Sequence, residues 1–244
     1  MLFRSSLTLS PSGIGSEYAS SGYVNIGGKE ICSFTRSGDV LTLTRGQYNT
    51  VGVAHDASER VQQCAVWITQ NPGQIISDLL LTYAGIYSGW VPTSTWLTEC
   101  STYLGVSYSA NVAEPTSVAT LISELIEQAG LAMWFDNETQ LINLQVLRPI
   151  ASTAQLFDQS KYLVDSFAIK EQPEKRLSQV YTYFAKVNPL INQDQVNNYK
   201  SFVYSIDATS EAAYGGIAAI KTIFSRWIPD GGRAIATTWK VRIC

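Results

Sequence analysis

The sequence predicts an α+β protein with mainly antiparallel strands and about three short helices in its N-terminal half. Two observations lead to this class. Segments that alternate apolar and polar residues, or that are rich in β-branched and aromatic residues, recur along the whole chain between Gly, Pro, Asn and Ser residues. Three segments between residues 71 and 129 instead place apolar residues at helical spacing between capping residues and glycines.

The N-terminal part of the chain is predicted to be mostly β. Residues 22–36 alternate as a half-buried strand does, and residues 40–45 return after the turn at residues 37–39. We therefore expect a β-meander or hairpin pair over residues 22–45. The flanking segments are predicted to be a β-like start at 2–9, a loop or extended arm at 10–22, a loop at 47–59 and a strand at 61–69.

Three helices are expected next, and a glycine stops each of them. Asn71 as N-cap and a proline in the first turn begin the first helix, which ends at Gly85. The second occupies residues 92–105. The third has the clearest pattern, with a Thr or Ser cap at residues 116–117 and a stop at Gly130. Its apolar stripe comprises Val118, Leu121, Ile122, Leu125, Ile126 and Ala129.

The C-terminal half is predicted to be mainly antiparallel β. A soft boundary at residues 148–163 divides a first domain, 1–150, from a second, 151–244. The expected elements are a hairpin of residues 131–135 and 140–147, strands at 164–171, 177–186, 199–206 and 219–228, a short turn or helix at 209–216, and a segment at 234–244 that fits helix and strand equally.

The composition is poor in charge for a soluble protein. Charged residues make up 15% of the chain, against roughly 25% in a typical domain, and there are 13 Tyr and 6 Trp. Such a surface suits a subunit that buries much of its outside against other subunits, although a solitary β-rich domain with a polar, uncharged surface fits as well. The net charge of −3 and the lack of a Lys/Arg run argue against nucleic-acid binding.

Neither a membrane span nor a cofactor is expected. No window of roughly eighteen apolar residues occurs, and the N-terminus lacks the apolar core of a signal peptide, so assembly in a cytoplasm is the expectation. The four cysteines lie far apart without C-x-x-C spacing, which predicts free, mostly buried thiols and no metal site. Three glycine pairs lack the flanking residues of phosphate loops and predict turns, namely Gly27-Gly28, Gly215-Gly216 and Gly231-Gly232.

Catalytic chemistry finds little support in the sequence. His55 is the only histidine, and residues as close to it as Asp56 and Ser58 rarely reach the geometry of a catalytic triad. We expect His55 to fix its loop by a ring hydrogen bond or to lie at a subunit contact. Four carboxylates could serve a glycosidase, but each has a plain structural position, and no catalytic residue is predicted. They are Glu99, Glu114, Asp136 and Glu138.

The meander and the loop after it form a block whose order and spacing are more specific than any of its parts. The block comprises Gly22, Val24, Ile26, Gly27, Glu30, Ile31, the run from Leu41 to Gly46, Thr50, Ala54 and His55. In this order it resembles a segment of the tail-hub proteins of long-tailed bacteriophages.

A second set of short motifs extends the resemblance over most of residues 20–240, and the helix at 117–129 with the strand after it fits the same family. The set comprises Pro173, Glu174, Arg176 and Val180, then Tyr199, then Ser210, Tyr214 and Gly215, and finally Lys221, Ile223, Ser225, Arg226, Trp227 and Ile228. In that family the segment after Trp-Ile continues into a longer helix and further strands, whereas this chain stops at Cys244. A partial copy with an incomplete second hub domain is therefore one expectation.

The resemblance implies a structural subunit of a phage or prophage tail tip or baseplate hub, located in the virion and without enzymatic activity. Such hubs are commonly homotrimeric rings that connect the tail tube to the tip, form the channel for DNA delivery, and contact the distal tail and tape-measure proteins. We predict Arg45, His55, Arg226 and Trp227 at subunit interfaces. Two alternatives stay open: the stem of Arg45 covers apolar surface, or Arg226 stacks on Trp227.

Two rival functions are considered. A carbohydrate-binding module for host recognition would present Tyr87, Trp90 and Trp96 as coplanar, exposed rings, although Trp96 itself is predicted to lie in the core. A cell-wall hydrolase would need two carboxylates, such as Glu99 and Glu114, that face each other across a cleft.

Overall fold

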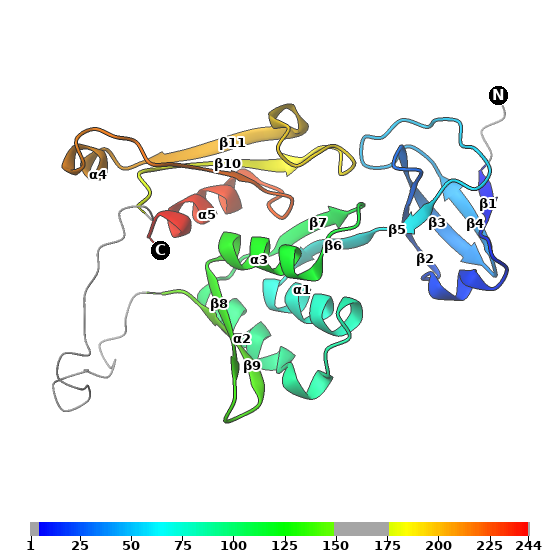
Figure 1. Cartoon of the computed structure of the whole chain (residues 1–244), viewed down its shortest axis with the longest axis horizontal. Coiled ribbons are helices and arrows are strands. Elements are labelled where there is room, and N and C mark those ends of the chain that lie inside the picture. The colour runs from blue at the N-terminus through cyan, green and yellow to red at the C-terminus, as the bar shows by residue number, and fades with distance from the viewer. Residues whose placement is uncertain (1–4, 149–175, 244) are drawn as a thin grey trace.

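The computed structural model describes residues 5–148 and 176–243. Helices account for 28% and strands for 33%, which confirms the predicted α+β class. The described strands pair antiparallel, except that β10 and β12 run parallel. A small N-terminal sheet lies at one end of the molecule, and the later elements form a larger body beside it (Figure 1).

The N-terminal sheet has five strands in the order β1-β4-β3-β2-β5. The predicted meander forms, but residues 22–36 are two strands instead of one, because Gly27 and Gly28 turn the chain with φ angles of 61° and 71°. The short helix η1 follows β1 in the chain and precedes β2. The bounds are β1 Ser6–Thr8, η1 Ile14–Glu17, β2 Ser21–Ile26, β3 Glu30–Ser37, β4 Val40–Thr44 and β5 Val61–Gln63.

Helices pack beside a two-stranded sheet at the start of the larger body. The strand predicted over residues 61–69 is split at Cys64, so that β5 belongs to the first sheet and β6 pairs with β7, a strand that the sequence did not suggest. All three predicted N-terminal helices are confirmed. The bounds are β6 Ala65–Gln70, α1 Pro72–Asp78, η2 Leu79–Tyr83, η3 Ser88–Trp90, α2 Thr93–Tyr103, β7 Tyr108–Val112 and α3 Val118–Ala129.

Local capping explains where these helices begin. The side chain of Asn71 accepts a hydrogen bond of 2.8 Å from the backbone N–H of Gly73 at the start of α1. The hydroxyl of Ser117 accepts one of 3.1 Å from the N–H of Thr120 at the start of α3. Both bonds satisfy N–H groups that have no partner within the helix.

The C-terminal sheet has the order β11-β10-β12, and α5 covers its inner face. The hairpin β8–β9 is confirmed, and the segment that fitted helix and strand equally is part of α5. The bounds are β8 Leu131–Asp136, β9 Leu141–Val146, β10 Gln179–Lys186, η5 Val196–Asn198, β11 Tyr199–Ile206, α4 Ala208–Ala213, β12 Ile220–Phe224 and α5 Gly231–Ile243.

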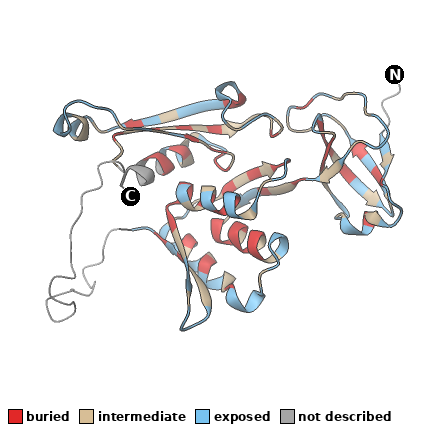
Figure 2. Cartoon of the chain, viewed as in Figure 1, coloured by how far each residue is buried: buried red, intermediate tan, exposed pale blue. Residues whose placement is uncertain are grey.

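The largest apolar cluster draws on residues from both sides of the predicted domain boundary. Trp67, Trp96 and Leu125 from the first part pack with Trp227 and Ile228 from the second. Buried residues accordingly gather on α1, α3 and the sheet strands that face them (Figure 2). The predicted strand at 164–171 lies outside the described residues, as does all but one residue of the predicted boundary at 148–163.

Candidate functional site

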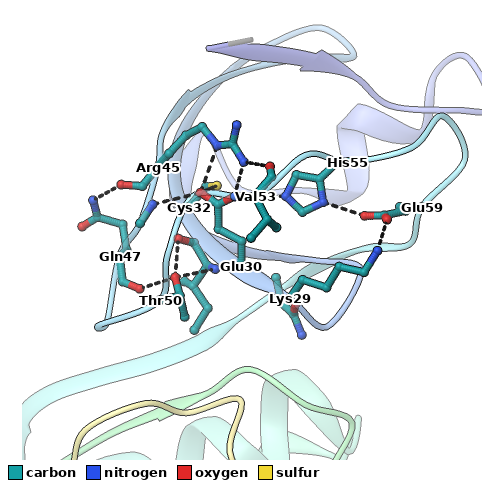
Figure 3. A network of polar contacts seen from close by, with 12 residues as sticks. Lys29, Glu30, Cys32, Arg45, Gln47, Thr50, Val53, His55 and Glu59 are labelled. Atoms are coloured by element: carbon teal, nitrogen blue, oxygen red, sulfur yellow. Dashed lines mark hydrogen bonds and ion pairs between the residues drawn. The ribbon is translucent and has the colours of Figure 1, made fainter. Parts of the chain in front are cut away.

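The loop after β4 folds back over β3 and closes on one buried carboxylate. Glu30 is the first residue of β3 and is 0% exposed. Its carboxylate accepts hydrogen bonds from Arg45 Nε at 2.9 Å, the N–H of Gly46 at 3.0 Å and the N–H of Val53 at 3.1 Å. Arg45 also reaches the second carboxylate oxygen through Nη2 (Figure 3). The two side chains therefore form a two-pronged ion pair inside the fold.

His55 joins this pair to a second carboxylate nearer the surface. Its Nε2 lies 3.1 Å from Glu30 Oε2, and its Nδ1 lies 2.6 Å from Glu59 Oε2. Lys29 Nζ lies 2.5 Å from Glu59 Oε1. Each carboxylate thus has a cationic side chain of its own, with the histidine between them (Figure 3).

The charge state of Glu30 follows from these donors. Burial alone would raise the pKa of its carboxyl, but the donors around it, led by Arg45, outweigh burial and lower the pKa from 4.5 to about 2. Burial and the nearby Glu30 carboxylate raise the pKa of the Cys32 thiol to about 12. At neutral pH the site therefore holds an ionised Glu30 beside a protonated, unreactive thiol.

The remaining residues of the block shape the loop itself. Thr50 Oγ1 accepts from the N–H of Ile31 at 3.0 Å and donates to the carbonyl of Gln47 at 2.7 Å. Gly46 has a φ of 65°, and a Cβ atom there would lie 3.3 Å from the carbonyl oxygen of Thr50. The block residues between Glu30 and His55 are therefore held together in the fold by these neighbouring hydrogen bonds and ion pairs.

Arg45 and His55 keep part of their surface at a cavity. Their side chains are 19% and 16% exposed. A cavity of about 520 Å³ beside them is lined also by Glu59 and by residues of β1. The buried stem of Arg45 and its bonds to Glu30 make it a structural residue of its own chain, and the predicted subunit contact of these two side chains stays a prediction.

Arg226 and Trp227 belong to a separate cluster, at the end of the C-terminal sheet. Arg226 Nε lies 3.0 Å from Glu124 Oε2 on α3, so the guanidinium is paired with a carboxylate. The indole of Trp227 is 0% exposed, lies 5.7 Å from the ring of Trp67, and donates to Glu124 at 3.3 Å. Trp227 is thus a core residue of its own chain and presents no surface to a second subunit, contrary to its predicted place at an interface.

The aromatic platform of the carbohydrate-binding hypothesis does not form. Trp96 is 1% exposed, as its predicted place in the core requires, and its indole N–H donates to the carbonyl of Ile142 at 3.1 Å. Tyr87 and Trp90 are exposed, but their ring planes meet at 86°. These three rings therefore offer no common flat surface to a sugar.

The carboxylates of the hydrolase hypothesis have structural partners or lie in turns. Glu99 accepts a hydrogen bond from the N–H of Val146 at 3.0 Å and pairs with Arg148 at 2.5 Å. Asp136 accepts from the N–H of Glu138 at 2.9 Å within the hairpin turn. Glu114 is exposed in the loop between β7 and α3.

Sequence reasoning missed the partners that give Arg45, His55 and Arg226 their roles. Glu30 was part of the motif without a role, and Glu59 and Glu124 were not identified. For Glu30 a signal exists, since a charged residue within an otherwise apolar strand start predicts a buried ion pair. For Glu124 the helical spacing is misleading, because it places the residue outside the apolar stripe of α3.

The described residues hold free cysteines and form no cluster of metal ligands. Cys32, Cys64 and Cys100 are free and buried, as predicted, whereas Cys244 lies outside the described residues. Within residues 5–148 and 176–243, the acidic, histidine and cysteine side chains form no group of three that could hold a metal ion. In those same ranges, none of the helices has the length and apolar character needed to cross a bilayer.

No protein-family model matches the chain, and no curated protein matches its sequence.

Proposed function

We propose that this chain is a structural subunit of the tail-tip or baseplate hub of a long-tailed bacteriophage or prophage. One observation supports the proposal most. The residues that carry the resemblance in the N-terminal half, including Glu30, Arg45, Gly46, Thr50 and His55, share one set of hydrogen bonds and ion pairs. A motif whose members depend on one another in this way is retained or lost as a unit, which gives the resemblance more weight than separate matches would have.

The proposed role is assembly. Copies of the chain form a closed ring, a trimer in the family that it resembles, which connects the tail tube to the tip and encloses the channel for DNA. The partners are further copies, the distal tail protein and the tape-measure protein. The place of action is the virion, after assembly in the cytoplasm of the bacterial host. No bond in a substrate is broken, and the role of the ion-pair network is to hold the loop over β3 in one conformation.

The low charge of the chain and its exposed hydrophobic side chains agree with this role. Large hydrophobic side chains are exposed on several elements, among them Val51, Ile68, Tyr87 and Tyr204. Exposed apolar residues that lie together in a patch mark contact sites on a protein surface, whereas scattered ones are ordinary. Burial between subunits would remove them from water.

The first experiment is the mass of the purified protein in solution, measured by light scattering over a wide concentration series. The expected result is three times the chain mass, with a ring and a central opening in electron micrographs of the same sample. A monomer at every concentration, or an open filament, would overturn the hub proposal.

A further inference from the structure

The outer face of the C-terminal sheet is aromatic and faces solvent. α5 covers the inner face, whereas side chains from all three strands gather on the outer one. Phe202 is 49% exposed and Tyr204 is 62% exposed, and β11, which carries them, is an edge strand of this sheet (Figure 2). We define the aromatic sheet face as Tyr181, Tyr183, Phe202, Tyr204 and Phe224.

The rings of this face stand side by side across the strands. The ring centroids of Tyr183 and Phe224 lie 5.1 Å apart with planes at 21°, and those of Tyr183 and Phe202 lie 5.4 Å apart with planes at 29°. Tyr181 and Tyr204 repeat the arrangement at 5.9 Å and 28°. Each separation is close to the strand spacing of about 4.8 Å, so neighbouring rings cover one another's faces and turn their edges outward. Sugar stacking needs free ring faces, whereas ring edges fit against the faces of aromatic side chains of a protein.

A second exposed aromatic group lies beside the β8–β9 hairpin. We define the hairpin cluster as Tyr87, Trp90 and Phe135, which are 66%, 41% and 47% exposed. The ring centroids of Tyr87 and Trp90 lie 5.9 Å apart, and those of Trp90 and Phe135 lie 6.1 Å apart, both in edge-to-face geometry. Because successive rings stand at steep angles, some ring faces of the hairpin cluster stay open. The outward ring edges of the aromatic sheet face can pack against these open faces.

The two groups lie at opposite ends of the larger body. Figure 1 shows β11 at one end and the β8–β9 hairpin, with α2 beside it, at the other, and α5 and α3 lie between them. One copy therefore cannot join its own two groups. A contact between copies that uses both groups is head-to-tail, and head-to-tail contacts close into rings when the rotation permits.

Charges at the rims of the two groups are complementary. Lys200 lies two residues before Phe202 on β11 and is exposed. Glu138 follows Phe135 in the hairpin turn and is also exposed. A basic residue beside one aromatic group and an acidic residue beside the other favour contact of unlike groups over contact of like groups.

The exposed area is that of a contact site. An aromatic side chain has about 150–250 Å² to bury, so each group exposes a few hundred Å², the range of functional patches on monomers. A standard interface removes about 800 Å² from each partner, so one such contact is weak on its own. Closure of a ring, in which every copy makes two contacts, offsets that weakness.

We propose that the aromatic sheet face of one copy packs against the hairpin cluster of the next copy, with Lys200 beside Glu138 of the neighbour. This inference deepens the proposed hub function and rests on it for the closure of the ring. The occupant of each group is a second copy of this chain.

The test uses one substitution in each group, and light scattering as the readout. Tyr204→Asp disrupts the sheet face, and Tyr87→Asp disrupts the hairpin cluster. Val40→Asp, at a residue that is 41% exposed at the start of β4 in the N-terminal sheet, is the matched control. Circular dichroism of each variant confirms that it is folded.

Each variant alone is expected to be monomeric, while the control assembles like the unaltered protein. At the highest concentrations of the series, an equimolar mixture of the two variants is expected to form a one-to-one dimer, because one supplies an intact sheet face and the other an intact hairpin cluster. This dimer has a single contact without ring closure, so it should dissociate at higher concentration than the unaltered assembly does. The inference is overturned if either variant assembles normally, if the mixture stays monomeric, or if the unaltered protein never associates.

Charge reversal gives a second measurement that leaves the aromatic residues in place. Lys200→Glu and Glu138→Lys are each expected to weaken association about fivefold, the usual size for an exposed ion pair, and the combination in one chain to restore it. No recovery in the combined variant would contradict the proposed pairing of the rims.

The outcomes separate this inference from the hub proposal. Association through these two groups into dimers or open filaments would support the inference and overturn the hub function. A closed trimer that neither aspartate substitution affects would support the hub function and overturn this inference.

Discussion

Two arginine–carboxylate pairs, both within the resemblance, lie in different surroundings. In the N-terminal sheet, Arg45 pairs with Glu30, whose side chain is 0% exposed. In the larger body, Arg226 pairs with Glu124, whose side chain is 22% exposed. The residue types and the ion-pair chemistry are the same. The difference lies in how far water reaches the carboxylate and in which further donors surround it.

Burial decides what each pair does for the fold. Removal of Glu30 from water is costly and is offset only because backbone N–H groups of Gly46 and Val53 supplement the arginine. These donors come from the loop, so the ion pair and the loop conformation form together. Glu124 keeps contact with water and needs no such enclosure. We therefore expect the first pair to be essential for stability and the second to contribute little.

The largest expected effect is that of Arg45→Met. The substitution leaves an ionised carboxylate buried without its cation, which costs about 3–5 kcal/mol of unfolding free energy. Urea unfolding followed by tryptophan fluorescence and circular dichroism measures the loss. Arg60→Met, at an exposed arginine of the same loop, is the matched control and should change stability by less than about 0.5 kcal/mol.

A double variant tests the cause of that loss. Glu30→Gln removes the buried charge, so the combination of Glu30→Gln with Arg45→Met should be more stable than Arg45→Met alone. If the double variant is less stable than both single variants by the sum of their losses, an unpaired charge is not the reason.

The next effect is a loss of stability in acid. The pKa of Glu30 is lowered in the folded chain from 4.5 to about 2, so its ionised form stabilises the fold above pH 4.5. That contribution, about 3 kcal/mol, is lost as the pH falls from 4.5 to about 2. The measurement is the difference in unfolding free energy between the unaltered protein and Glu30→Gln at several pH values. A difference that stays constant over this range would contradict the prediction.

Local features could be predicted from the sequence. The helix α3 and the hairpin β8–β9 depend on neighbouring residues: the Ser117 cap, an apolar stripe, the Gly130 stop and a polar turn. Each signal lies within the element that it defines. The class of the fold follows, because it needs only the number and type of such elements.

Features that depend on distant partners could not be predicted. β7 has only five residues, and its partner β6 lies more than thirty residues earlier in the chain. α5 contains β-branched residues that suit a strand, yet Ala234 is 0% exposed and Thr238 bonds Thr182 at 2.9 Å beneath the sheet. Packing against β10 and β11 outweighs the local preference.

The candidate site shows the same limit. The sequence identified Arg45 and His55 as unusual residues but not the carboxylate that they share. Glu30 precedes them by 15 and 25 residues, and only the β3–β4 hairpin and the return of the loop bring the three together. Trp227 is predicted at an interface together with its neighbour Arg226, whereas its own chain encloses it.

A smaller effect is expected for Arg226→Met. Glu124 keeps a solvated edge, so loss of its cation should cost about 1 kcal/mol, well below the loss at Arg45. The same urea experiment measures it, with Glu124→Gln as the companion variant. A loss of 3 kcal/mol or more would place this pair in the same class as Glu30 and Arg45 and break the comparison.

The smallest effect is expected for the ion pair of Lys221 with Glu127, whose side chains are 36% and 44% exposed. Glu127 lies one turn after Glu124 on α3, so both carboxylates belong to the same helix, but Glu127 is more exposed and pairs with a lysine instead of an arginine. Lys221→Met should change the unfolding free energy by no more than about 0.5 kcal/mol, and added salt should remove most of that change. A double-mutant cycle with Glu127→Gln isolates the pair from other contacts of the two side chains.

A coupling energy as large as that of Arg226 with Glu124 would mean that burial does not control the strength of these pairs. A coupling that falls in the order Arg45, Arg226, Lys221 would establish burial as the cause.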